Sequence, residues 1–289
     1  MKKILTFFLA LTLIAGLGSA MAISEGDSRA VIGADLTAEQ KASVYKTFGI
    51  EQGAVRELSV TNAEERTYLD GLVASSVIGT RSISCVYIEV LGAGKGLEVE
   101  VSNINWCTKE MYTNALVTAG IDDARLIVTS PIAGISGTAA LTGIYKAYED
   151  ITGEPLDEIA KLAGTQELVI TAELADEIGN IDAVTIVNEL KLILDQTVNM
   201  TDAELIAEIK QIAADYDISV SDGQINQLVS LCRSLEKLDP DQLRAKVESL
   251  KDTFVKLSGA KEKAGELVES VKGFFQSVGN FFSNIFSKK

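Results

Sequence analysis

The sequence predicts an α+β fold, with a mixed α/β region over residues 23–150 and a mostly helical region after it. Three observations lead to this prediction. Short runs that alternate apolar and polar residues recur between capped helical segments up to residue 150. Beyond residue 154, apolar residues recur at helical spacing instead. The chain has 289 residues, 47% of them hydrophobic and 23% charged, so it is long and apolar enough to fold around a core without disulfides or metals.

The first region begins with a predicted strand at residues 29–32 and a helix that Thr37 caps. Thr37 and Gln40 have the residue types and the spacing of a capping box. A second strand at 55–61 leads to a helix that we expect to open at Asn62 in the same way. The remaining elements are strands at 83–90 and 97–101 that form a hairpin around the turn at 91–96, a helix at 108–119, a strand at 124–129 and a helix at 137–150.

Two stretches of this region resemble each other. Residues 37–50 and 108–121 match at an initial Thr, a Glu, a second Thr and a final Gly-Ile pair. The match predicts a duplicated β-α-β unit. The alternative is that two unrelated units share ordinary cap and stop residues.

The rest of the chain divides into two helical segments. Residues 151–238 contain further capping boxes at 201–204 and 221–224, which predict a compact helical domain. Residues 239–289 begin with Asp-Pro, a common helix start. A long amphipathic helix is then predicted by the spacing of Leu243, Val247, Leu250, Phe254 and Leu257.

The N-terminus has the features of a signal peptide over residues 1–22. Lys2 and Lys3 precede an apolar stretch at 4–18, and Ala20 and Ala22 form an A-x-A cleavage pattern. The alternative is a membrane anchor, for which the apolar stretch is short. We therefore expect cleavage after Ala22 and a secreted, extracellular protein that associates peripherally with the cell envelope.

Charge and composition exclude several functions. Lys and Arg number 26 against 41 Asp and Glu, for a net charge of −15, which argues against nucleic acid as a partner. The chain has no histidine, so Ser-His-Asp, Cys-His and His-ligated metal sites are excluded. We expect no metal and no cofactor. Cys85 and Cys107 lie near the outer ends of the predicted hairpin, and either a disulfide or two buried free thiols is compatible with that position; free thiols are favoured.

One turn is a candidate for ligand binding. Residues 134–137 read Gly-Ile-Ser-Gly, which resembles the start of a nucleophile elbow but has Thr138 where the elbow needs glycine. Without a histidine to activate Ser136, no catalytic residue is predicted. A polar N-cap is expected here, and backbone N–H groups at a helix start can bind an anion or carboxylate. Ser136, Gly137 and Thr138 are therefore the candidate ligand-binding residues; the small-molecule ligand is unknown.

The C-terminal tail is the strongest candidate for an interaction surface. Residues 241–289 have a net charge of +3, whereas residues 23–240 have a net charge of −20. The uncharged stretch at 273–287 is too short to span a bilayer. A membrane surface or an envelope protein is the expected partner; docking on the protein itself and an oligomer interface are the alternatives. The contact residues are Phe274, Phe275, Val278, Phe281, Phe282, Ile285 and Phe286.

Three segments carry a family resemblance: Ala-Val-Ile-Gly-Ala-Asp-Leu-Thr at 30–37, Val-Leu-Gly-Ala-Gly-Lys-Gly-Leu at 90–97, and the stretch from Pro131 to Leu141. With the signal peptide, they resemble the YpuA-like family of exported bacterial proteins, a domain of unknown function. The resemblance covers roughly residues 25–240. It implies export and a Gram-positive origin, and it implies no activity.

The sequence as a whole indicates a non-enzymatic binding or interaction module of the cell envelope with a surface-active tail. The alternative is an exported hydrolase that uses paired carboxylates, because such a pair can carry out acid–base catalysis without histidine.

Overall fold

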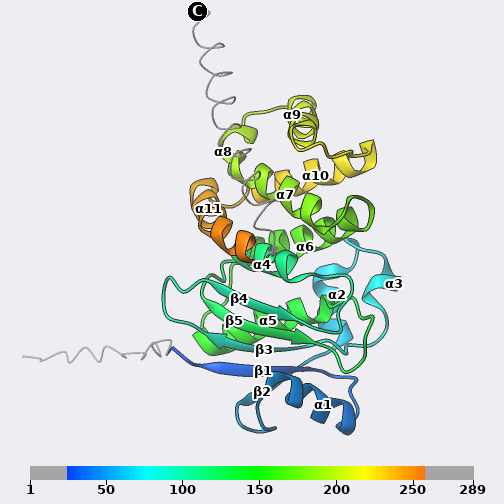
Figure 1. The fold of residues 1–289 in the computed structure, drawn as a ribbon, viewed down its shortest axis with the longest axis vertical. Helices are drawn as coiled ribbons and strands as arrows, with labels where there is room; N and C mark the ends of the chain where they lie inside the picture. Colours follow the sequence, from blue (N-terminus) through cyan, green and yellow to red (C-terminus); the bar gives the residue numbers. More distant parts are fainter. Residues whose placement is uncertain (1–24, 258–289) are drawn as a thin grey trace, which may run out of the picture.

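The computed structural model describes residues 25–257, with side chains up to residue 250 (Figure 1). Its centre is a five-stranded sheet in the order β2-β1-β3-β5-β4. The strands are β1 (Ser28–Gly33), β2 (Arg56–Val60), β3 (Cys85–Val90), β4 (Leu97–Val101) and β5 (Ala124–Thr129). The predicted α+β fold is confirmed: a mixed α/β region carries the sheet, and a helical region follows it.

Four strands of the sheet run the same way. β1 pairs with β2 and β4 pairs with β5 in parallel, while β3 lies between the two pairs and is antiparallel to both neighbours. The carboxyl ends of β1, β2, β4 and β5 therefore share one edge of the sheet with the start of β3. This edge positions the candidate site described below.

The predicted hairpin between β3 and β4 is wrong, because β5 lies between them. The turn at 91–96 instead passes the start of β5, where the Gly96 N–H donates to Asp123 Oδ1 at 2.7 Å. Cys85 and Cys107 are buried free thiols, as favoured. Burial raises the pKa of the Cys85 thiol to about 12 and raises that of Cys107 as well, so neither thiol is reactive at neutral pH.

Local caps place many of the helices. Capping boxes at Thr37, Thr201 and Ser221 are confirmed, and Thr108 forms another. The second helix is capped by Thr61 with Glu64, one residue before the expected box. The helices are α1 (Ala38–Phe48), α2 (Asn62–Leu69), α3 (Ser75–Ile78), α4 (Lys109–Thr118), α5 (Thr138–Thr152), α6 (Glu158–Ile178), α7 (Asn180–Leu192), α8 (Leu194–Thr197), α9 (Asp202–Asp215), α10 (Asp222–Leu235) and α11 (Pro240–Leu257).

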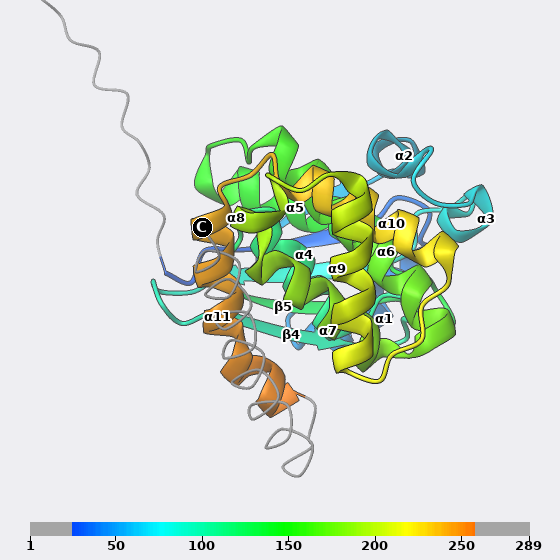
Figure 2. The ribbon, with the colours of Figure 1, turned by 90° about the horizontal axis from the view of Figure 1, so that it is seen from above.

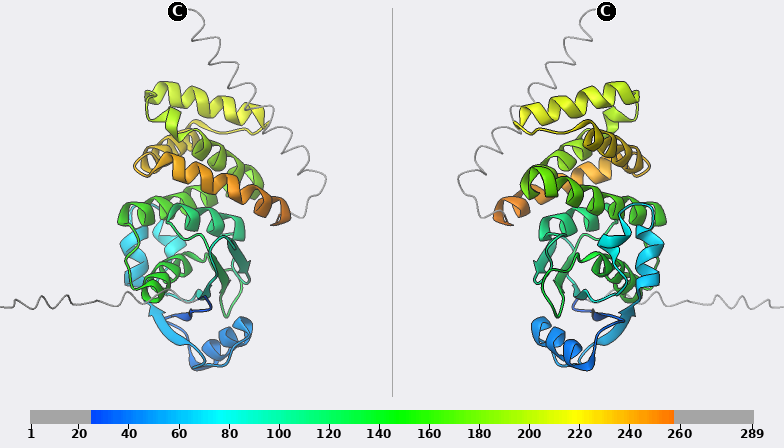
Figure 3. Two further views of the ribbon diagram at one scale, coloured as in Figure 1. Left: turned by 90° about the vertical axis from the view of Figure 1, so that its left-hand side faces the viewer. Right: turned by 90° about the vertical axis from the view of Figure 1, so that its right-hand side faces the viewer.

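The two faces of the sheet have separate cores. Alternation along β1 sends Ala30 and Ile32 to the face covered by α1, where they pack with Tyr45 and Phe48. The other face packs against α4 and α5, and its core continues through α6 and α7 into α9, α10 and α11. In Figure 3, α1 lies on the opposite side of the sheet from this helical layer. Figure 2 views the layer from above.

The two units of the proposed duplication share their order of elements, but their helices pack on different faces of the sheet. Both β1-α1-β2 and β4-α4-β5 are parallel β-α-β units, and both step in the same direction across the sheet. However, α1 packs on one face and α4 on the other. The two crossovers therefore have opposite hands, and the units cannot superpose as copies.

The last described helix matches the predicted pattern. Leu243, Val247 and Leu250 of α11 are buried, as their spacing indicates. The predicted contact residues of the tail, from Phe274 to Phe286, lie outside the described residues, as does the signal segment at 1–22. Over residues 25–257, every helix is too short or too polar to cross a membrane.

Candidate binding cleft at the sheet edge

A cleft of about 450 Å³ lies at the shared carboxyl edge of the parallel strands. Its wall includes Asn105 and Trp106, which follow β4, and Ser136, which follows β5. Glu65 enters from α2, the helix after β2, and Ser84 comes from the residue before β3. Open α/β sheets bind ligands at the carboxyl ends of their strands, because loops of variable sequence converge there.

The segment before β3 is held rigidly beside the cleft. Gly33 ends β1 so close to this segment that a Cβ there would lie 2.3 Å from the Ser82 carbonyl oxygen. The Ser82 N–H donates to Asp35 Oδ2 at 2.7 Å. The wall that carries Ser84 is therefore held against the end of β1 by the close approach at Gly33 and by the hydrogen bond to Asp35.

Glu65 is the most unusual group in the cleft, because its side chain is a carboxyl group and the residue is only 1% exposed. Thr138 Oγ1 donates to Glu65 Oε1 at 2.5 Å, and Asn62 Nδ2 donates to Oε2 at 3.3 Å. Burial raises the pKa of Glu65 to about 6, against these two hydrogen bonds and the charge of Arg66, which lower it. A perturbed carboxyl group in a cleft is a typical mark of a functional site.

The three predicted ligand-binding residues occupy different positions. Ser136 and Thr138 line the cleft, and their hydroxyl oxygens are 3.2 Å apart. Gly137 is buried, and its carbonyl oxygen accepts a hydrogen bond from Tyr112 Oη at 2.6 Å. The expected polar N-cap is absent: Gly137 itself caps α5, with φ 95° and no side-chain hydrogen bond.

A carboxyl group of the protein itself lies at the start of α5, where the sequence predicted an external anion or carboxylate. Thr138, the first residue of α5, donates to the protein's own Glu65 carboxyl group. A hydrogen-bonded series runs from Ser136 through Thr138 to Glu65. An external anion at this helix start would lie close to that carboxyl group.

Sequence reasoning missed several lining residues. Ser84 is 3% exposed, and within the described residues its hydroxyl has no hydrogen-bond partner. Trp106 is half-buried and donates its indole N–H to Asp176 Oδ2 at 3.0 Å. The sequence held one usable signal, since Trp106 is the single tryptophan of the chain. Glu65 could be read only as a helix-capping residue.

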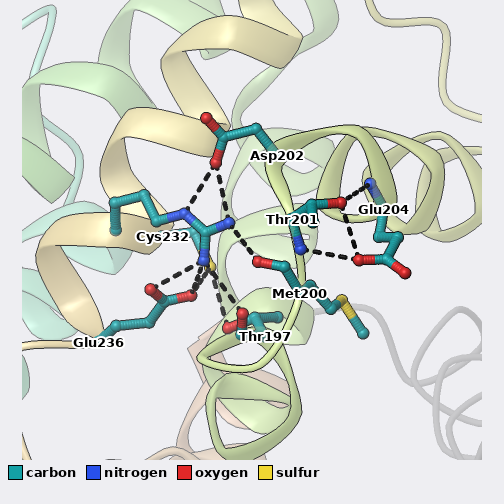
Figure 4. A network of polar contacts seen from close by, with 8 residues as sticks. Thr197, Met200, Thr201, Asp202, Glu204, Cys232 and Glu236 are labelled. Atoms are coloured by element: carbon teal, nitrogen blue, oxygen red, sulfur yellow. Dashed lines mark hydrogen bonds and ion pairs between the residues drawn. The ribbon is translucent and has the colours of Figure 1, made fainter.

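A second polar cluster, shown in Figure 4, is structural. The Arg233 guanidinium donates to Asp202 Oδ1 at 2.9 and 3.0 Å and to both carboxylate oxygens of Glu236. It also donates to the carbonyl oxygens of Thr197 and Met200. These contacts raise the pKa of Arg233 and fasten the α8–α9 connection to α10. The guanidinium is engaged on every side by the protein, so it is not available to a ligand.

Clustered metal ligands are absent from the part of the chain that the structure describes. Between residues 25 and 257, no three Cys, Asp or Glu side chains are grouped so that they could hold a metal ion.

Comparison with known proteins places the chain in a family. The family model described as "Protein of unknown function (DUF1002)" matches residues 32–253, which include the end of β1, strands β2 to β5, the cleft and most of the helical region. The uncharacterized protein YpuA of Bacillus subtilis (strain 168) is 37% identical over 264 residues, which is 90% of each chain. No solved structure matches significantly. The chain thus belongs to the DUF1002 family of proteins of unknown function, and its similarity to YpuA confirms the YpuA-like resemblance predicted from the sequence.

Proposed function

We propose that this protein is an exported, non-enzymatic binding module of the cell envelope, in which the cleft holds a small ligand and the C-terminal tail contacts a membrane surface or an envelope partner. The observation that supports a bound ligand is the cleft itself. It combines a buried carboxyl group at Glu65 with a buried hydroxyl group at Ser84 that lacks a hydrogen-bond partner among the described residues. Unsatisfied buried polar groups are costly, and a ligand would satisfy them.

Binding fits the geometry better than catalysis. Both oxygens of Glu65 accept hydrogen bonds from the protein, which hold the carboxyl group in place. Ser136 contacts Thr138, whose hydroxyl is not a base, so the serine has no activating partner in this series. These contacts position groups for recognition rather than prepare a nucleophile.

The alternative, a hydrolase that works without histidine, has one observation in its favour. The pKa of Glu65, raised to about 6 by burial, suits a general acid or base, and Asp176 lines the same cleft. A hydrolytic activity that disappears in Glu65→Gln would establish this alternative and overturn the non-enzymatic proposal.

The first experiment blocks the cleft. Ser136→Phe places a ring in its lining, and Ser43→Phe makes the same change on the exposed side of α1 as a control. After incubation with the low-molecular-weight fraction of an envelope extract, native mass spectrometry should detect a retained ligand on the wild type and on Ser43→Phe. Ser136→Phe should lose at least 90% of the ligand-bound species. Identical spectra for all three proteins would overturn the assignment of the cleft.

The second experiment concerns the tail. Burying a phenylalanine side chain fully in an apolar phase is worth about 1.5–3 kcal/mol, so several partly inserted rings give reversible membrane binding. Co-sedimentation with anionic liposomes should fall more than tenfold for a chain truncated after Val271 and for Phe281→Ser with Phe282→Ser. Asn280→Ser with Asn284→Ser serves as the control on the polar face and should bind as the wild type does. Equal co-sedimentation of all these proteins would contradict a tail-dependent membrane contact.

A further inference from the structure

Two carboxyl groups line the cleft, and no basic side chain of the described residues pairs with either of them. Glu65 receives hydrogen bonds from Thr138 and Asn62, and Asp176 receives one from the Trp106 indole. Within residues 25–250, no lysine or arginine nitrogen comes within 4.0 Å of either carboxyl group. Glu65 is buried and Asp176 is exposed, and a buried charge is normally paired, so the missing basic partner is notable at Glu65.

Arg81 is the basic residue in the lining, and its guanidinium is hydrogen-bonded to the backbone. Its side chain is exposed, and its guanidinium donates to the Asp35 carbonyl oxygen at 2.9 Å. The cleft thus carries two acidic side chains against one basic side chain that the protein already engages. A cationic group would complement this arrangement, whereas an anion would meet Glu65.

We propose that the ligand of the cleft presents a primary alkylammonium group to Glu65, with its aliphatic stem along the apolar wall. This inference rests on the proposed function, in which the cleft holds a ligand. An ammonium group has three donors. Glu65 and the free Ser84 hydroxyl supply acceptors in the cleft, and Asp176 supplies a further carboxylate in the lining.

The rest of the lining suits the stem of such a ligand. Ile78 and Ile83 are buried, and Val77 and Ile135 are partly buried beside them in the wall. Trp106 adds an aromatic ring, against which a cation is attracted by the π system. The net charge of the chain, −15, also draws cations toward the protein.

The protonation of Glu65 should control affinity. The charged or titratable groups around it are Arg66 on α2, Cys107 before α4 and Tyr112 on α4, with Arg81 and Asp176 in the same cleft lining. Burial raises the pKa of Cys107 and Tyr112 far above neutral, whereas it raises that of Glu65 only to about 6. Below that pH Glu65 is neutral and attracts an ammonium group less. The affinity for an amine should therefore fall about tenfold from pH 7 to pH 5.

Trp106 provides a direct readout, because it is the single tryptophan and it lines the cleft. The experiment follows Trp106 fluorescence of the mature protein during titration with n-pentylamine. Pentan-1-ol and pentanoate serve as neutral and anionic probes of the same length. We expect pentylamine to bind at least tenfold more tightly than either, with the stated loss at pH 5.

Two variants test the role of the carboxyl groups. Glu65→Gln keeps the hydrogen-bonding shape, removes the charge and should weaken pentylamine binding at least tenfold, without the pH dependence. Glu98→Gln removes the same charge from an exposed position on β4 and should bind as the wild type does. If Glu65→Gln does not fold, as judged by circular dichroism, Asp176→Asn at its exposed position should still weaken binding by several fold.

The outcomes separate this inference from the proposed function. Equal or tighter binding of the alcohol or of pentanoate, or no response to any probe, overturns the alkylammonium assignment. The cleft remains a ligand site if Ser136→Phe still abolishes the retained ligand in the mass spectra. If pentylamine is not preferred and Ser136→Phe also retains the ligand as the wild type does, the proposed function is overturned as well.

Discussion

Replacing Lys191 with methionine should lower the free energy of unfolding by about 3–5 kcal/mol. Lys191 on α7 and Glu167 on α6 are both fully buried, and Lys191 Nζ lies 2.5 Å from Glu167 Oε1. Thr118 on α4 donates to the other carboxylate oxygen at 2.5 Å. The substitution leaves the Glu167 carboxylate in the core without its counter-charge, and urea unfolding followed by circular dichroism measures the loss.

A double substitution separates the net contribution of the ion pair to stability from the cost of burying one unpaired charge. Burial lowers the pKa of Lys191 while Glu167 raises it, so desolvation and pairing oppose each other at this site. Lys191→Met with Glu167→Leu removes both charges and should recover most of the lost stability, since buried pairs replaced by apolar residues are often neutral. A double variant as unstable as Lys191→Met would contradict this account.

A surface pair provides the matched control. Lys41 Nζ lies 2.6 Å from Glu57 Oε1, and the two side chains are 26% and 33% exposed. Lys41→Met should therefore cost less than about 1 kcal/mol. If Lys191→Met costs no more than Lys41→Met, water must reach the interior pair, and the description of a buried ion pair is wrong.

Sequence reasoning succeeded where the determining interactions are local. The boxes at Thr37, Thr201 and Ser221 each join residues three apart, so their side chains specify the helix start without help from the fold. The burial of Leu243 and Val247 also followed from spacing alone, because one face of a helix repeats every three to four residues.

Long-range pairing was beyond this reasoning. The residues 83–90 and 97–101 have the alternation and the short turn of a hairpin, yet β5 lies between the two strands. Nothing in either strand specifies its neighbour, since alternation identifies the buried face and not the partner. For the same reason, the sequence did not predict that α1 and α4 pack on opposite faces of the sheet, although their caps match in sequence.

The candidate site shows the same division. Ser136 and Thr138 were found because a glycine-rich turn before a helix is a local signal. Glu65 and Ser84 come from segments before and after α3 that meet only at the sheet edge. Their importance lies in burial and in missing partners, which are properties of the fold rather than of the residue types.

Gly164→Ala should lower the free energy of unfolding by about 2 kcal/mol or more, as measured by urea unfolding. α6 crosses α4 so closely at Gly164 that a Cβ would lie 2.6 Å from the Ala115 carbonyl oxygen. The atom it meets belongs to the backbone of a buried helix, so relief requires the two helices to separate. Overpacking of this kind costs about 1–3 kcal/mol or more, which exceeds the gain of up to about 1 kcal/mol in helix propensity.

Two further glycines in helices turn this prediction into a ranking by local space. A Cβ at Gly143 of α5 would lie 3.0 Å from Val31 Cγ1, a side-chain atom that can shift, whereas at Gly223 of α10 the nearest atom is 3.9 Å away. Gly223→Ala should therefore be neutral or stabilising, Gly143→Ala intermediate and Gly164→Ala the most harmful, because the same methyl group meets open space, a movable side chain and a fixed backbone in turn. If Gly164→Ala is as stable as Gly223→Ala, then α4 and α6 are not in backbone contact, and the continuous core between the sheet and the helical layer does not depend on that close crossing.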